Sequence, residues 1–166
     1  MLYVAQKCQE HSKFGSTKLN KILFYSDFLS YGMKGKAITG AEYFKLDFGP
    51  VPRRLKAVES GLIQGGDAVV QKMDFLGREQ KRLVALRDPD LSLFRADEID
   101  LVNKVIEKLK DMTAEEVSDL SHKRIWRIAG LKETIPYEAF FVSDRDADDA
   151  DIQRAHELIA EYKWAV

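Results

Sequence analysis

Residues 18–31 read KLNKILFYSDFLSY and are the most apolar helical candidate in the chain. Its apolar residues recur at three- and four-residue spacing, which predicts a helix. Three aromatic residues in its middle widen the apolar stripe until most of the circumference is apolar. Because a helix of that kind is buried among other elements, we expect residues 18–31 to form the central helix. Gly32 and Gly35 are predicted to end it.

The segment before this helix predicts a short helix and a loop. Residues 2–10 place Leu2, Ala5 and Cys8 on one side of a helical turn. Residues 11–15 are expected to form the loop that follows. Ser16 or Thr17 is predicted to cap the central helix, because a hydroxyl can accept a hydrogen bond from its first free N–H groups.

The segment after the central helix is less regular. Residues 39–48 fit a short helix or a strand equally well. The sequence GPVP at 49–52 is expected to break any regular element, since proline lacks an N–H and restricts the residue before it. Pro52 is predicted to lie in the first turn of a helix. That helix would reach residues 62–64 and end at Gly65-Gly66.

The second half predicts a hairpin and then more helices. Residues 69–86 alternate around a turn near Gly77 and indicate an antiparallel β-hairpin. Residues 99–112 carry an amphipathic helical stripe, and Thr113 begins a capping-box sequence.

Residues 149–164 predict a closing helix. Its inner face is expected to consist of Ile152, Ala155, Ile159 and Tyr162. We therefore expect an α+β, mainly α-helical fold in one domain over residues 1–166, with a compact helical body around a buried central helix and a small hairpin inserted mid-chain.

Composition indicates an ordinary globular protein, with 45% hydrophobic and 32% charged residues and a net charge of −1. The charge is unevenly distributed: residues 1–83 carry 14 basic and 8 acidic residues, and residues 84–166 carry 12 and 19. Cys8 is the only cysteine, so an intramolecular disulfide is excluded. Without a signal-like apolar start or an apolar run of about 18 residues, the sequence predicts a cytoplasmic protein with no membrane segment.

No pattern of reactive residues predicts catalysis, a cofactor or a metal. The acidic run at 144–151 lacks the glycine and glutamate of a calcium loop and is better explained as helix capping. Asp119, Ser121 and His122 lie too close in sequence for a hydrolase triad. Cys8 and His11 have no second pair of ligands for zinc. The sequence therefore favours a protein that is not an enzyme.

One basic segment could indicate DNA binding. Arg53, Arg54 and Lys56 open a predicted helix, as a recognition helix would. A solvated basic face explains the same residues, and the chain has no basic tail. Nucleic acid is therefore not the expected partner.

Several short motifs resemble the Panacea, or SocA-like antitoxin, domain in their order and spacing. The stretch 18–27 resembles the family's KLxKLLYFAD. Residues 35–40, GKAITG, and 44–52, FKLDFGPVP, resemble its GxxITG and YGPV motifs. Leu120-Ser121-His122 with Trp126, and IPYE at 135–138, resemble its closing motif. Phe48 stands where the family often has tyrosine. The resemblance covers residues 18–138.

The resemblance implies a bacterial, often prophage-associated antitoxin that neutralises a toxin encoded nearby by direct binding. Alternatives are a proteolytic adaptor that delivers the toxin to a protease, and a DNA-binding or prophage regulator. The sequence leaves the oligomeric state and the toxin open. The motif residues are expected to be structural or partner-binding: Lys18, Leu19, Lys21, Phe24, Tyr25, Asp27, Gly49, Pro50, Val51, Trp126 and Pro136. Candidate interface anchors, chosen as aromatic or basic residues near helix ends, are Tyr31, Arg53, Arg54 and Trp164.

Overall fold

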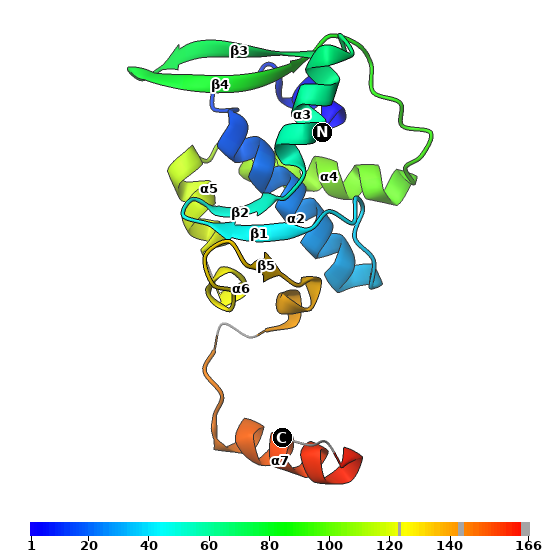
Figure 1. The fold of residues 1–166 in the computed structure, drawn as a ribbon, viewed down its shortest axis with the longest axis vertical. Helices are drawn as coiled ribbons and strands as arrows, with labels where there is room; N and C mark the ends of the chain where they lie inside the picture. Colours follow the sequence, from blue (N-terminus) through cyan, green and yellow to red (C-terminus); the bar gives the residue numbers. More distant parts are fainter. Residues whose placement is uncertain (123, 143–144, 164–166) are drawn as a thin grey trace.

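The computed structural model describes residues 1–122, 124–142 and 145–163, and it has the predicted α+β, mainly helical fold (Figure 1). The helices are α1 (Leu2–Cys8), α2 (Ser16–Lys34), α3 (Leu55–Gln64), α4 (Ala96–Leu109), α5 (Ala114–Ser121), α6 (Arg124–Arg127), the 3₁₀ helix η1 (Tyr137–Phe141) and α7 (Asp149–Tyr162). The strands are β1 (Tyr43–Leu46), β2 (Gly49–Pro52), β3 (Ala68–Phe75), β4 (Arg78–Ala85) and β5 (Thr134–Ile135). Within the described ranges, no helix combines the length and apolarity needed to cross a membrane.

Helix α2 is the buried central helix, as predicted, although it extends further at both ends. It starts at Ser16 because the N–H of Leu19 bonds to the carbonyl of Gly15, 3.0 Å away, so Gly15 occupies the cap position predicted for Ser16 or Thr17. Gly35 ends the helix in a left-handed conformation with φ 68°. Gly32 lies inside the helix, where a Cβ would collide with the ring of Phe140 in η1. Its role is therefore close packing, and the prediction that it ends the helix was wrong.

The GPVP sequence forms strand β2 rather than breaking regular structure. β2 pairs antiparallel with β1, with Pro50 opposite Lys45 and Pro52 opposite Tyr43. The sheet order is β2-β1-β5, so β2 lies at an edge, where a residue without an N–H is tolerated. Helix α3 begins at Leu55, and the prediction that Pro52 opens it was therefore wrong.

The predicted hairpin is confirmed as β3 and β4, which pair in register from Ala68–Ala85 to Phe75–Arg78. Leu76 and Gly77 form the turn, both with positive φ. Arg82 on β4 is buried and donates hydrogen bonds to the backbone carbonyls of Phe14, Gln9, His11 and Ser12. The hairpin is thus tied to the loop that precedes α2.

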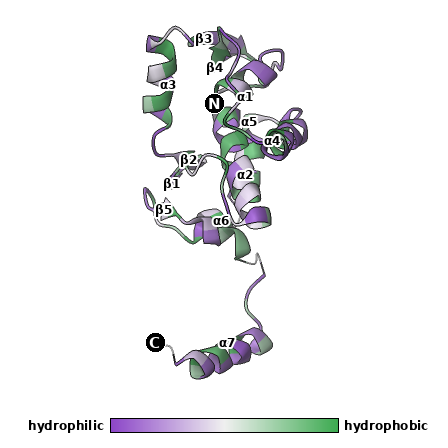
Figure 2. Ribbon diagram, turned by 90° about the vertical axis from the view of Figure 1, so that its right-hand side faces the viewer, coloured by the Kyte–Doolittle hydropathy of each residue, from purple (hydrophilic) through white to green (hydrophobic). Residues whose placement is uncertain are grey.

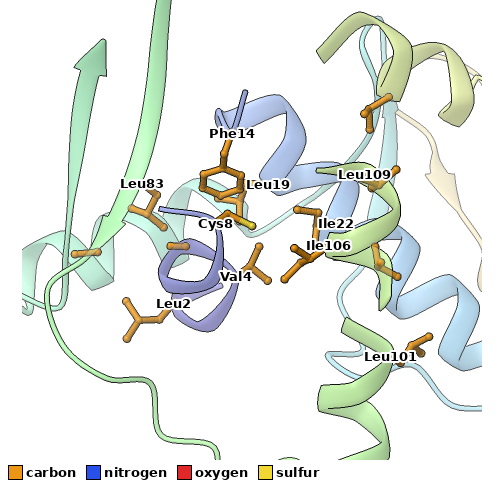
Figure 3. Close-up of a cluster of buried hydrophobic side chains, with 14 residues drawn as sticks. Leu2, Val4, Cys8, Phe14, Leu19, Ile22, Leu83, Leu101, Ile106 and Leu109 are labelled. Atoms are coloured by element: carbon orange, nitrogen blue, oxygen red, sulfur yellow. The ribbon is translucent and has the colours of Figure 1, made fainter. Parts of the chain in front are cut away.

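Two apolar clusters make up the core, one on each side of α2. The larger contains side chains from α1, α2, the hairpin, α4 and α5 (Figure 3). The smaller is aromatic: Phe24 and Phe28 of α2 pack on Tyr43 of β1, with ring centroids 5.6 Å apart in both pairs. Because both clusters contain residues of α2, this helix joins the two parts of the core.

The predicted helix over 99–112 is α4, which begins three residues earlier and ends three residues earlier than expected. The predicted capping box at Thr113 is confirmed: its hydroxyl accepts from the N–H of Glu116, 3.2 Å away, and the Glu116 carboxylate accepts from the N–H of Thr113 at 2.6 Å. Helix α5 therefore starts where the sequence places it.

Helix α7 forms as predicted but has no inner face. Figures 1 and 2 show it standing apart from the rest of the structure, and none of its residues is buried. The expectation that Ile152, Ala155, Ile159 and Tyr162 pack inward was wrong, because helical periodicity reports an apolar face but not what covers it. Asp148 caps the helix by accepting from the N–H of Asp151 at 2.9 Å. Asp144 and Trp164 lie outside the described residues.

Candidate functional site

Asp27, an ionisable side chain buried on α2, finds its partners within the fold. It accepts hydrogen bonds from the Thr39 amide at 2.7 Å, the Thr39 hydroxyl at 2.5 Å and the Tyr43 hydroxyl at 2.7 Å. Burial beside this carboxylate raises the pKa of Tyr43 well above its usual value. Asp27 therefore anchors the loop around Thr39 and the first residue of β1 to the central helix.

Lys21 holds the chain at the Gly49-Pro50 position. Its side chain is 1% exposed, and its Nζ donates to the carbonyl of Phe48 at 2.6 Å and lies 3.4 Å from that of Pro50. Burial lowers the pKa of this amine to about 7. Ser118 of α5 donates to the same Phe48 carbonyl at 3.0 Å. Two helices thus meet on one backbone oxygen.

Gly49 fits between these groups because it has no side chain. Its φ is 98°, a conformation that favours glycine. A Cβ at this position would collide with Lys21 Nζ and lie 2.5 Å from Ser121 Oγ. The glycine of the motif is therefore required by both backbone conformation and space.

Other motif residues on α2 are also interior. Lys18 is buried and donates to the carbonyl of Lys110 at the end of α4, 2.7 Å away, and burial lowers its pKa. Leu19 and Phe24 belong to the two apolar clusters. The Tyr25 hydroxyl, in contrast, is buried without a hydrogen-bond partner among the described residues. Burial raises the pKa of Tyr25.

Trp126 of α6 contacts strand β1. Its Nε1 donates to the carbonyl of Leu46 at 3.0 Å, and the Lys45 ammonium lies 3.9 Å from its ring centroid. His122 packs against the same indole with centroids 4.4 Å apart, and burial together with the Lys21 charge lowers the pKa of His122.

The remaining closing-motif residues have structural positions. Ser121 is buried and donates to the Ser118 carbonyl at 2.7 Å. Pro136 is exposed at the position before η1. Pro50 is buried in β2, and Val51 is half-buried beside it. The structure thus places most motif residues where they shape the fold rather than on its surface.

A groove opens where this scaffold meets α3, and we call it the α3 groove. Its larger part has a volume of about 480 Å³ and an adjoining part of about 60 Å³, and both parts are lined by Met1, Leu23 and Thr39. Apolar side chains of the larger part include Leu23, Tyr43, Pro52, Leu55 and Val58. The loop that Asp27 holds, residues 39–42, forms one wall.

Helix α3 forms the opposite wall and is largely exposed. Leu55 is its only buried residue, while Val58 is 44% exposed. Figure 2 shows α3 set apart from α1 and α2. Glu42 and Arg54 place opposite charges on the rim. An apolar floor with a charged rim suits a protein partner better than a small polar ligand.

The predicted interface anchors are dispersed. Arg54 lines the α3 groove. Arg53 lies nearby, 3.3 Å from the Glu42 carboxylate and 3.1 Å from the Thr134 hydroxyl. Tyr31 is at the far end of α2, donating to Glu138 at 2.7 Å and stacking on Tyr137. Sequence reasoning missed the groove itself, because the spacing of Leu55 and Val58 indicates a helix but does not show whether another element covers it.

No metal site is evident in the part of the chain that the structure describes: His, Cys, Asp and Glu side chains do not gather there in groups of three or more. Cys8 is buried in the apolar core, and burial raises the pKa of its thiol to about 11. This thiol is therefore held in its neutral form at neutral pH.

Comparison with known proteins gives one match. The sequence model of a family described as antitoxin SocA-like, Panacea domain, matches residues 19–127. The matched range contains most of α2, strands β1 and β2, helix α3 and all of α6. No curated protein and no solved structure matches the chain.

Proposed function

The chain belongs to the SocA-like Panacea domain family, and from that premise we propose that it is an antitoxin that neutralises a toxin protein by binding it directly. The family supports a role connected with toxin–antitoxin systems. Direct binding is supported by the α3 groove, because this groove is an open apolar surface framed by the motif residues. We further propose that residues 1–166 act as one domain, with the motif residues as its scaffold.

The proposed mechanism is steric. The toxin would insert apolar side chains between Leu23 and Val58, and Glu42 and Arg54 would fix its orientation through charge. A stable pair of this kind buries about 1,600 Å² in total, of which a few central residues contribute most of the affinity. Docking over that area would block the toxin's active site or substrate channel.

The rigid wall of the groove matters for affinity. Asp27 accepts two hydrogen bonds from Thr39 of the loop and a third from Tyr43 just after it, so the loop is fixed before any partner arrives. A preorganised loop loses less conformational freedom on binding than a mobile one. The motif residues thus support binding from inside without touching the partner.

The first experiment is growth rescue. Each gene beside the one that encodes this chain is expressed alone and together with it. We expect one neighbour to arrest growth, co-expression to restore growth, and the two proteins to purify together. If none of the neighbours is toxic, the antitoxin proposal is contradicted.

A matched pair of substitutions then tests the groove. Val58 and Ile63 lie on the same helix and are 44% and 41% exposed, but only Val58 lines the groove. Val58→Glu should abolish rescue and weaken toxin binding at least tenfold, whereas Ile63→Glu should leave both unchanged. Equal effects of the two would place the toxin on another surface.

The remaining predicted anchors stay predictions. Arg54→Glu reverses a rim charge and should weaken binding. Tyr31, Arg53 and Trp164 are tested by alanine substitution.

Two alternative functions predict other results. Rescue that needs a protease and occurs without a stable complex would instead indicate a proteolytic adaptor. Binding to promoter DNA that weakens steeply with salt would indicate a regulator.

A further inference from the structure

Helix α7 is an amphipathic helix that stands apart from the body (Figure 1). Ile152, Ala155 and Ile159 recur at three- and four-residue spacing, and none of the residues of α7 is buried. An isolated 14-residue helix is marginal in water, and helices in proteins are stabilised mainly by packing of an apolar face. The stability of α7 therefore depends on a surface that covers this face.

The same chain carries an apolar groove between α2, α4 and α5, which we call the α4 groove. It has a volume of about 230 Å³ and is lined by apolar and aromatic residues: Tyr25, Leu29, Leu101, Val105, Leu109 and Leu120. Leu101, Val105 and Leu109 lie in one i, i+4 ridge of α4 and are buried, so they form the floor of the groove, while the half-buried Tyr25, Leu29 and Leu120 give it its accessible apolar surface. Lys104 and Lys108 stand on the rim.

We propose that the α4 groove is the docking site for α7 of a second copy of this chain. Each copy would place its α7 in the groove of the other. The exchange is reciprocal and closes in a symmetric dimer, in which both helices and both grooves are filled.

Size and charge support this occupant. The ridge from Leu101 to Leu109 is about 12 Å long and the stripe from Ile152 to Ile159 about 10 Å, at 1.5 Å per residue. Helix α7 has four acidic residues (Asp149, Asp151, Glu157 and Glu161) against Arg154 as its one lysine or arginine. It would dock beside the ammonium groups of Lys104 and Lys108, although Lys104 also pairs with Asp100 at 2.7 Å.

The position of α7 favours a second copy over the chain's own body. Figure 1 shows the helix standing away from the body, and the body carries the α4 groove between α2, α4 and α5. An arm that leaves its own domain and matches a surface on that domain has the geometry of an exchanged element. The α4 groove is also separate from the α3 groove, since the two share no lining residue.

Cross-linking between two variants tests the exchange directly. In a full-length Cys8→Ala background, one variant carries Lys108→Cys and the other, with a mass tag, carries His156→Cys at the edge of the apolar stripe. A mixture treated with a short bis-maleimide should give a cross-linked pair that contains one chain of each kind. Glu157→Cys, on the opposite side of α7, is the matched control and should cross-link at least fivefold less.

Two other results would overturn the proposal. A double variant, Lys108→Cys with His156→Cys, that cross-links within one chain at high dilution, while the mixture gives no pair, would show that α7 folds back on its own body. Absence of cross-linking in both experiments would mean that α7 serves a different partner.

Sedimentation provides a second test that does not rely on the cross-link. We expect the wild-type chain to be a dimer at tens of micromolar. Ile159→Asp should raise the dimer dissociation constant at least tenfold. Ala160→Asp introduces an aspartate at the neighbouring position, which lies outside the apolar stripe. It should change the dimer dissociation constant less than threefold. A wild-type chain that stays monomeric at these concentrations would refute the exchange.

Discussion

Lys21 brings a primary amine into the interior without a carboxylate contact among the hydrogen bonds and ion pairs described for it. Two backbone carbonyls of the Phe48–Pro50 segment accept its protons. The pKa of about 7 follows from this burial. The amine thus holds the turn in place, but keeping its charge buried costs free energy at neutral and acidic pH.

This cost makes a pH-dependent prediction. The unfolded amine has a pKa near 10.5, so between pH 7 and 10.5 the unfolded state binds more protons than the folded state, and stability rises with pH. In Lys21→Met this contribution is absent. The free energy of unfolding of the wild type, minus that of Lys21→Met, should therefore rise by about 1.4 kcal/mol per pH unit in this window.

Urea unfolding of both proteins at pH 7, 8 and 9 measures the difference. Taking the difference removes the opposing titration of Cys8, whose folded pKa is raised to about 11. Parallel pH profiles for the two proteins would show that the folded amine titrates near its ordinary pKa.

Gly49 gives a second prediction for a single residue. Gly49→Ala adds a strained positive φ and a Cβ that collides with Lys21 Nζ, so it should cost about 3 kcal/mol or more of the free energy of unfolding. Gly35 also has a positive φ, but a Cβ there meets nothing within 4 Å. Gly35→Ala should cost only about 1 kcal/mol. Chemical denaturation of both variants separates crowding from backbone strain; equal costs would contradict the crowding.

Between elements, Arg82 shows a connection that periodicity does not reveal. It lies on β4 but fixes residues 9–14, a loop about 70 positions earlier in the chain, through four backbone carbonyls. Lysine has a single ammonium and cannot reproduce the planar fork of the guanidinium. Arg82→Lys should therefore leave carbonyls unpaired.

We expect Arg82→Lys to lower the free energy of unfolding by about 2–3 kcal/mol. Hydrogen exchange of residues 9–14 should accelerate more than exchange within α4. Arg78→Lys, on the exposed end of the same strand, is the control and should change neither quantity appreciably. A uniform acceleration over the whole body would indicate that Arg82 does not act locally on this loop.

The elements also show how far sequence patterns carry. The helices α2, α4, α5 and the hairpin were predictable because their periodicity and capping residues are local. The strand at Gly49–Pro52 was not, since proline argues against a strand unless the strand is known to be at an edge. The α3 groove was not predictable either, because Leu55 and Val58 give the same helical spacing whether or not another element covers them.

At the scale of the whole molecule, the two exposed apolar surfaces have different proposed partners. The α3 groove is framed by the family motifs, which the sequence contains in recognisable form. Helix α7 carries no such motif, and only the structure shows that the helix predicted to pack inward is uncovered. We pair α7 with the α4 groove because their charges and lengths are complementary and because α7 lies outside the body.

The exchange of α7 predicts how thermal stability depends on concentration. A dimer that dissociates on unfolding is stabilised by mass action, so the Tm of the full chain should rise as its concentration is raised from about 1 to 100 µM. A variant that ends at Val142 lacks α7, and its Tm should be independent of concentration. Since α7 has no buried residue on its own body, that Tm should equal the value of the full chain at the lowest concentration. Scanning calorimetry under reversible conditions measures both. A truncated variant that melts several degrees lower even in dilute solution would show that α7 stabilises its own body, and a full chain with constant Tm would remove the dimer.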